Sequence, residues 1–186
     1  MAYHTLAERF VYSFTLKNLL GAAFLAAIVS PAAASSFPTS GPTVPGSVAR
    51  VRYGQAHAPE KAPLAVKRAI WAGNQLRAKR YRFGGGHRSF NDSGYDCSGT
   101  VSYVLGGAGL LKSPTSSAGL RSFGQRGGGK WITVYARKGH TFAVIAGLRI
   151  DTTPWDESTD RRRWAPRWQS TFRKPSGFEA RHPIGL

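Results

Sequence analysis

The sequence predicts an α+β domain in which N-terminal helices pack on an antiparallel β-sheet. Two segments have apolar side chains at helical spacing, namely residues 60–80 and the stretch that begins at Cys97. Three short runs of strand-forming residues then follow within residues 131–151, separated by turns that contain glycine. Strands joined by short turns pair antiparallel, so helices followed by consecutive strands favour this class.

The first 34 residues have the three parts of a secretory signal peptide. Arg9 and Lys17 precede an uncharged run of 11 residues at 19–29, and small residues follow up to Ala34. That run is shorter than the roughly 20 residues of a membrane-spanning helix. We therefore expect cleavage near Ala34 and a periplasmic or secreted protein. An uncleaved N-terminal anchor is the alternative.

Residues 35–59 are rich in proline, serine and glycine, which predicts a flexible linker or tail. The remaining residues 60–186 are enough for one domain with a core. The whole chain has a net charge of +17, which favours polyanionic partners such as nucleic acid, anionic lipid or acidic envelope polymers. Export favours the envelope polymers, and nucleic acid is not an expected partner.

The first predicted helix, residues 60–80, is amphipathic. Ala65, Ala69 and Leu76 fall on one face, opposite basic side chains that can face water. Next comes YRFGGGH at residues 81–87, whose consecutive glycines allow close approach to the main chain. It lacks the frame of a phosphate-binding loop.

A second helix is predicted from Cys97, with Asp96 as its N-cap and Gly106-Gly107 as its end. Residues 112–130 hold six glycines or prolines and predict mainly loop. The predicted strands follow: Trp131–Ala136, His140–Ile145, and a third that starts at Leu148.

Cys97 is the chain's one cysteine, so it has no intramolecular disulfide partner. In an oxidising compartment such a thiol is buried and inert, paired with another chain, or chemically used. The N–H groups at a helix start favour the thiolate, the form that acts as a nucleophile.

An imidazole is the usual activator of a nucleophilic thiol, and His140 is the best-placed histidine. It begins a predicted strand after the flexible Gly139, and Asp151 at the end of the next strand could orient its ring. The other histidines after residue 34 are less well placed: His57, His87 and His182. From spacing alone a buried, inert cysteine and a structural histidine remain open. No zinc-ligand spacing occurs, and we expect no metal or other cofactor.

Three blocks together resemble the NlpC family of papain-like cysteine peptidases, which cut the stem peptides of bacterial peptidoglycan. They are Tyr81-x-x-Gly84-Gly85, then Asp96-Cys97-Ser98-Gly99, then Gly139-His140 at the start of an apolar strand. The resemblance covers roughly residues 60–155 and implies the papain-like NlpC fold. The block around Cys97 is the most specific of the three.

The resemblance implies a role for each matched residue. Cys97 would be the nucleophile, His140 the base, and Asp151 the third polar residue, with Thr152 its nearest substitute. Tyr81 would help to stabilise the oxyanion. Asp96 and Ser98 match positions that in some members hold the free amine end of a stem peptide. Gly84 and Gly85 are the other implied substrate-binding residues.

The sequence also departs from the family. Members commonly have a Pro-Gly-Asp turn before the strand where Gly127-Gly128-Gly129 stands here, and no recognisable wall-binding module precedes the domain. Two alternatives to a peptidase therefore stay open. One is a catalytically silent, basic envelope-binding protein on the same fold. The other is an amidase or acyltransferase that uses the same cysteine and histidine.

A basic aromatic segment, residues 161–174, lies near the C-terminus. Trp164, Trp168 and Phe172 recur every four residues among arginines. The favoured interpretation is that the aromatic rings close the core while the arginines face water. The alternative is that the segment walls one side of a substrate groove and attracts acidic wall polymers. Pro166 argues against one continuous helix.

Overall fold

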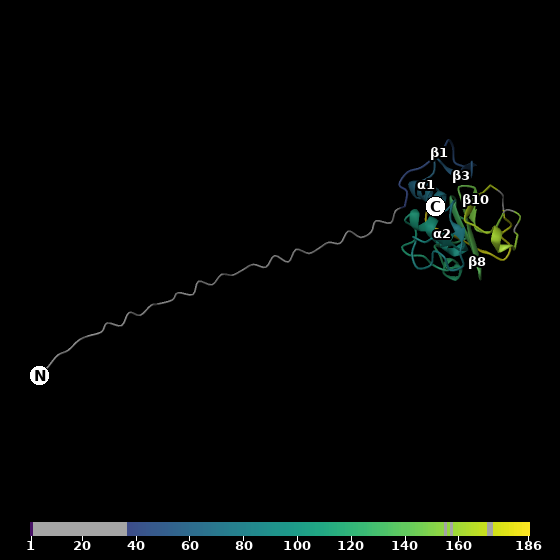
Figure 1. Cartoon of the computed structure of the whole chain (residues 1–186). Coiled ribbons are helices and arrows are strands. Elements are labelled where there is room, and N and C mark those ends of the chain that lie inside the picture. The colour runs from purple at the N-terminus through teal and green to yellow at the C-terminus, as the bar shows by residue number, and fades with distance from the viewer. Residues whose placement is uncertain (2–36, 155, 157, 171–172) are drawn as a thin grey trace. The chain divides into compact units, whose positions relative to one another are not determined.

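The computed structural model describes Met1 and residues 37–154, 156, 158–170 and 173–186. The predicted signal peptide lies outside the described residues, apart from Met1. From residue 37 onward the chain forms one compact unit of helices and sheets (Figure 1). No helix in this described part is long and apolar enough to cross a membrane.

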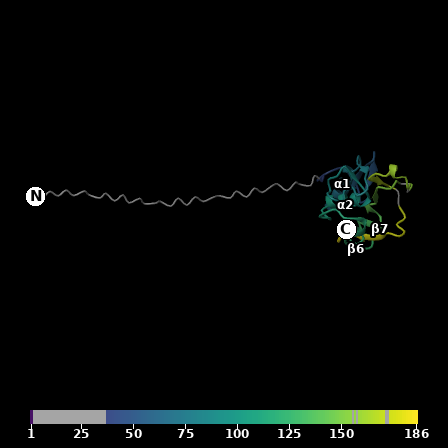
Figure 2. The ribbon, with the colours of Figure 1, turned by 60° about the horizontal axis from the view of Figure 1, so that its bottom comes forward.

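Two helices pack against each other in the domain (Figure 2). They are α1, Leu64–Gln75, and α2, Cys97–Gly107. The first is shorter than the predicted span of 60–80, and Pro63 explains its start because a residue before proline avoids helical conformation. The second begins and ends where the sequence predicts. A side chain at Gly107 would overlap Ala72 of α1, so this glycine lets the helices approach closely.

The helices face a six-stranded antiparallel sheet, which confirms the predicted α+β class. The strand order is β10-β9-β8-β7-β11-β6. In chain order its strands are β6 Gln125–Arg126, β7 Ile132–Arg137, β8 His140–Ile145, β9 Leu148–Asp151, β10 Arg167–Gln169 and β11 Glu179–His182. The three central strands β7, β8 and β9 are those that the sequence predicts.

The core lies between α1, α2 and the sheet. Its members include side chains that are fully buried: Val66 and Ile70 of α1, Val101 and Leu105 of α2, and Val134, Ile145 and Ile150 of the sheet. Contacts between α2 and β8 join the helix that begins at Cys97 to the strand that begins at His140. The core thereby places the two predicted catalytic residues on neighbouring elements.

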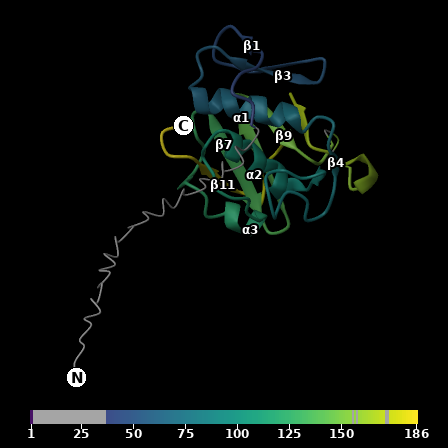
Figure 3. The ribbon, with the colours of Figure 1, turned by 60° about the vertical axis from the view of Figure 1, so that its left-hand side comes forward.

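The described part of residues 35–59 is folded, so the prediction of a flexible linker is wrong for residues 43–59. They form β1, Thr43–Val44, β2, Arg50–Arg52, and β3, Gln55–Pro59, a small sheet on the outer side of α1 (Figure 3). Ala56 and Ala58 are fully buried. The Asn74 side chain of α1 accepts from the Ala56 N–H at 2.9 Å and donates to its carbonyl at 2.8 Å. Alanine is only weakly hydrophobic, so the buried positions of these strands do not stand out in the sequence. The proline, serine and glycine of residues 35–59 therefore led to the prediction of a linker.

The remaining elements are short. The strands β4, Arg80–Tyr81, and β5, Gly94–Tyr95, pair in parallel and enclose the glycine loop. The predicted loop 112–130 also contains a short helix, α3, Ser117–Leu120, and strand β6. The basic aromatic segment forms a 3₁₀ turn, η1, Arg161–Arg163, followed by β10. It is therefore not one continuous helix.

Candidate active site

Cys97 is the first residue of α2, and Asp96 caps this helix as predicted. The Asp96 carboxylate accepts a hydrogen bond of 2.8 Å from the Gly99 N–H. The cysteine is 8% exposed, so the sulfur has a restricted path to solvent. The N-terminal end of a helix carries a partial positive charge, and Cys97 lies at that end of α2.

The glycine loop is packed against the first turn of α2. Gly84 N–H donates to Asp96 at 3.0 Å, and Asp96 N–H donates to the Gly85 carbonyl at 3.2 Å. A Cβ at Gly99 would overlap the Gly85 carbonyl, and one at Gly85 would overlap that of Gly94. Gly85 and Gly99 therefore serve close packing, whereas Gly84 has a positive φ of 71° and open space beside it.

His140 is the first residue of β8, and its buried ring contacts polar groups at the end of β9. The Nε2 atom lies 3.2 Å from Asp151 Oδ1 and 3.4 Å from Thr153 Oγ1. Burial by itself would lower the pKa of His140. Its hydrogen bonds to Asp151 and Cys97, and the negative charges of both, outweigh burial and raise the pKa to about 9.

Asp151 ends β9, and its side chain is fully buried. Its Oδ1 accepts from the Thr153 N–H at 3.0 Å besides facing His140. Its Oδ2 lies 3.1 Å from Arg173 Nη1 and 3.8 Å from Arg149 Nε. The structure thus brings the predicted third residue to the predicted base, and it adds two arginines to the group.

The register of β8 and β9 explains why Thr153, which the sequence analysis missed, reaches the histidine. Ala143 pairs with Ile150, so the same antiparallel register continued outward sets His140 opposite Thr153. Thr152, the predicted substitute for Asp151, is buried, and its hydroxyl has no hydrogen-bond partner among the described residues. Alternation along the strand from Asp151 would have indicated Thr153 rather than Thr152.

Aromatic rings surround His140. Trp164 lies 6.4 Å from the His140 ring, and Phe178 packs edge-on against it at 6.0 Å. Trp164 also packs edge-on against Tyr81 at 5.1 Å. Tyr81 itself pairs through β4 with Tyr95, two residues before Cys97. These contacts gather Tyr81, His140 and Trp164 from three distant parts of the sequence around one region.

Asp96 and Ser98, the predicted amine-binding pair, interact with a second histidine. His87 Nε2 lies 3.0 Å from both Asp96 Oδ1 and Ser98 Oγ. Ser98 Oγ also donates to Asp96 at 3.1 Å. Both residues are buried, and the Asp96 carboxylate binds the helix start and the glycine loop. Binding of substrate by Asp96, Ser98, Gly84 and Gly85 stays a prediction.

Some residues of the basic aromatic segment lie in the core, and others lie near the candidate active site. Trp168 is buried and lies against Gly73 of α1, in keeping with the favoured interpretation. Trp164 lies beside Tyr81 and His140, and a role of the segment as a groove wall stays a prediction. Arg162 faces solvent, whereas Arg173 is buried beside Asp151. Phe172 lies outside the described residues.

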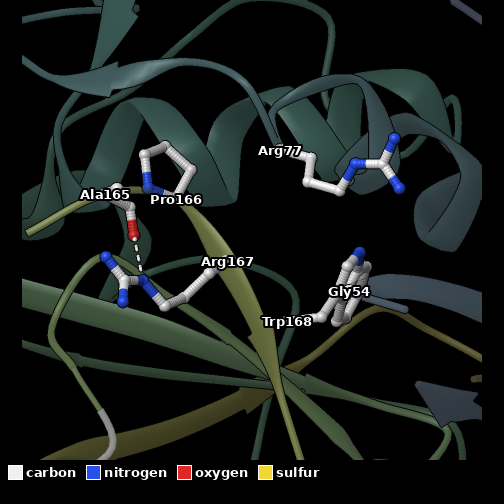
Figure 4. Close-up of a pocket in the computed structure, with 7 residues that line it drawn as sticks. Gly54, Arg77, Ala165, Pro166, Arg167 and Trp168 are labelled. Carbon is white, nitrogen blue, oxygen red and sulfur yellow. Dashed lines mark hydrogen bonds between the residues drawn. The ribbon is translucent and has the colours of Figure 1, made fainter. Parts of the chain in front are cut away.

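Within the described residues, no three His, Cys, Asp or Glu side chains are grouped closely enough to hold a metal ion. A hollow of about 250 Å³ lies between Gly54, α1 and β10. Figure 4 shows that its two guanidinium groups, those of Arg77 and Arg167, point away from each other. Arg167 Nε donates instead to the Ala165 carbonyl at 3.3 Å.

Comparisons with known proteins reveal similarity only among solved structures. No protein-family model matches the sequence, and no curated protein matches it. The structure is similar to the peptidoglycan hydrolase RipB from Mycobacterium tuberculosis, with a TM-score of 0.49, 20% identity and coverage of 66% of each chain. It is also similar to the hypothetical invasion protein Rv1477 of Mycobacterium tuberculosis, with a TM-score of 0.45, 18% identity, and coverage of 72% of this chain and 71% of that one.

A third similar structure is a mutated form of the Resuscitation Promoting Factor Interacting protein RipA. It has a TM-score of 0.45 and 18% identity, and the match covers 73% of this chain and 72% of that one.

Proposed function

We propose that this chain is a cysteine hydrolase that cuts an amide bond in peptidoglycan stem peptides. The observation that supports it best is the arrangement of three residues: Cys97 at the start of α2, His140 at the start of the neighbouring strand β8, and Asp151 beside the histidine. A thiolate, an imidazole and an orienting carboxylate are the groups that acyl transfer to water requires. The substrate class rests on the sequence resemblance around Tyr81, Cys97 and His140.

The proposed reaction has two halves. The Cys97 thiolate attacks the amide carbonyl carbon, and the oxyanion that forms is stabilised by the N–H groups at the start of α2 and by the Tyr81 hydroxyl. His140 then gives its proton to the leaving amine as the C–N bond breaks. In the second half His140 takes a proton from water, the resulting hydroxide attacks the thioester, and the free thiolate leaves. Asp151 holds the imidazole in place throughout.

Location and partners are part of the same proposal. Residues 1–34 would direct export, after which the mature protein meets peptidoglycan in the periplasm or outside the cell. Its strongly positive net charge would draw it to anionic envelope polymers, because residues 1–34 contribute little to the +17 of the whole chain. N-terminal sequencing of the mature protein from the producing cell tests the leader, and a mature start near residue 35 is the expected result.

Replacing Cys97 by alanine tests the chemistry. We expect Cys97→Ala to abolish release of peptide fragments from purified sacculi, because the acyl intermediate cannot form without the sulfur. Mass spectrometry of the released muropeptides identifies the bond that is cut. His140→Ala should give the same loss, while His182→Ala is the matched control and should keep activity. His182 is remote from the site and contacts the Gly127 carbonyl.

The outcomes separate the alternatives. Fragment release that survives Cys97→Ala would rule out the proposed nucleophile. A wild-type protein that binds sacculi without releasing fragments, and whose Cys97 reacts no faster with iodoacetamide than a model thiol, is a silent binding protein. Products that carry a new acyl acceptor in place of water would indicate an acyltransferase.

A further inference from the structure

Arg173 is the feature of the site that the proposed mechanism leaves unused. It is 9% exposed although it carries a full positive charge. Arginine is rarely buried to this extent unless it is paired, because removing a charge from water is costly. Its Nη1 atom lies 3.1 Å from Asp151 Oδ2, so its partner is the carboxylate that orients His140.

The surroundings hold the Arg173 guanidinium in place from two sides. It lies 5.6 Å from the ring centres of both Phe142 and Phe178, within the range of cation–π attraction. Phe142 is two residues after His140 on β8, and Phe178 packs edge-on against both Phe142 and His140. The guanidinium, the imidazole and the two rings form one packed cluster.

The two carboxylate oxygens of Asp151 face different partners. Oδ1 faces His140 and Thr153, whereas Oδ2 faces Arg173 and, at a longer 3.8 Å, Arg149. A carboxylate that also faces an arginine attracts the imidazolium less strongly than one that faces the imidazolium alone. The arginine also prevents the carboxylate from rotating freely.

We propose that Arg173 is a positioning residue: it fixes Asp151 and limits how strongly Asp151 holds the proton of His140. This inference rests on the proposed function, in which His140 must release that proton to the leaving amine. An acid that holds its proton too firmly transfers it slowly, so a counter-charge behind the orienting carboxylate favours turnover. Arg173 acts through Asp151 and is not itself a catalytic residue.

Five ionisable side chains lie on the elements around His140 and act on it directly or through another residue. Cys97 on α2 and Asp151 on β9 interact with it directly. Arg149 and Arg173 act through Asp151, and Arg137 of β7 lies 4.6 Å above the Phe178 ring. Arg149 also donates to the Gln169 side chain, which leaves Arg173 with the shorter contact to Asp151.

The test is the pH dependence of Cys97 alkylation by iodoacetamide in the purified mature chain. We expect Arg173→Met to move the upper transition, where the imidazolium loses its proton, to higher pH by about one unit. In the hydrolysis assay kcat should fall about tenfold or more while KM stays unchanged. Arg173→Lys keeps the charge and should leave the transition close to that of the wild type.

Arg167→Met is the matched control. It removes the same charge from the same segment, but its guanidinium faces the Ala165 and Arg163 carbonyls. It should leave the profile unchanged. If Arg173→Met does not fold, Arg173→Gln carries the test with the same expected shift, because glutamine is neutral and still polar. An upper transition that stays in place, or that moves to lower pH, overturns the proposal.

Alkylation requires no peptidoglycan, so the two proposals can fail separately. If the wild-type chain releases no fragments from sacculi but Arg173→Met shows the upward shift, the proposed hydrolase activity is refuted. The proposed effect of Arg173 on His140 through Asp151 then still holds. Fragment release with no shift in the variant refutes the role of Arg173 alone.

Discussion

At the scale of single residues, the site depends on how His140 is bound. Its Nε2 lies 3.2 Å from Asp151 Oδ1, and Cys97 also acts on its ionisation. Two negative charges near one buried imidazole outweigh the penalty of burial and favour the imidazolium. The imidazolium form of His140 is the one that can give a proton to a leaving group.

The raised pKa of His140 predicts how activity and stability depend on pH. Activity should hold through neutral pH and fall as pH rises through about 9, because a neutral imidazole cannot protonate the leaving amine. The stability that the imidazolium contributes should be complete below 6.5, the ordinary value, and lost as pH rises through about 9. Measuring kcat/KM and thermal unfolding as functions of pH checks both.

Asp151→Asn gives this prediction its control. Loss of the carboxylate charge should lower the pKa of His140, so both transitions should move from about 9 toward 6.5. Thr152→Val should leave them in place, since the Thr152 hydroxyl has no hydrogen-bond partner among the described residues. Transitions that are insensitive to Asp151→Asn would assign the orienting role to another residue.

At the scale of elements, the site depends on the contact between the glycine loop and α2. The loop supplies the Gly84 N–H and the Gly85 carbonyl to Asp96, and Asp96 in turn caps the helix that carries Cys97. At the other end of the loop, the Gly86 N–H and Arg82 hold Asp92 and lower its pKa to about 2, with burial opposing them. The interactions of the Asp92 carboxylate with Gly86 and Arg82 are therefore kept above about pH 2.

Gly99→Ala tests this packing. Its Cβ would overlap the Gly85 carbonyl, so either the loop or the helix start must shift. We expect the free energy of unfolding to fall by about 1–3 kcal/mol, and Cys97 alkylation at neutral pH to slow. Chemical denaturation and iodoacetamide kinetics measure the two effects. Gly128→Ala is the control because its nearest neighbour, Thr133 Oγ1, lies 3.8 Å away. Equal stability of the two variants would contradict the packing described here.

At the scale of the whole molecule, the domain extends beyond residues 60–186. The three-stranded sheet of residues 43–59 covers the outer side of α1, and its buried alanines belong to the same core. At the other end of the chain, Arg173 and Phe178 return to the site after β10. Both ends of the folded unit therefore support the elements that carry Cys97 and His140.

Truncation tests the extended domain. A chain that begins at residue 60 should be less stable than one that begins at residue 37, by about 2 kcal/mol or more, because it exposes the face of α1 that Ala56 and Ala58 cover. Thermal and urea unfolding of the two chains measure the difference. Asn74→Ala in the longer chain should give a smaller loss through its two hydrogen bonds to Ala56. Equal stability of the two chains would restore the linker interpretation.

Local sequence patterns were enough to predict the fold class, the helix that begins at Cys97 and the three central strands. These depend on local signals: the Asp96 cap, the spacing of Val101, Val104 and Leu105, and the β-branched run from Ile132. It also singled out His140 and Asp151, because antiparallel strands bring the start of one near the end of the next.

The other side chains of the site could be identified only from the folded structure, because they reach it through strand register and long-range contacts. Thr153 depends on the register of β8 and β9, and register is not visible in either strand alone. Trp164 and Arg173 reach His140 and Asp151 through contacts between segments distant in sequence. The folded sheet of residues 43–59 was hidden because its core side chains are alanines. A local sequence pattern reflects the secondary-structure propensity of its own residues. Packing and charge pairing between distant segments form only when the chain folds.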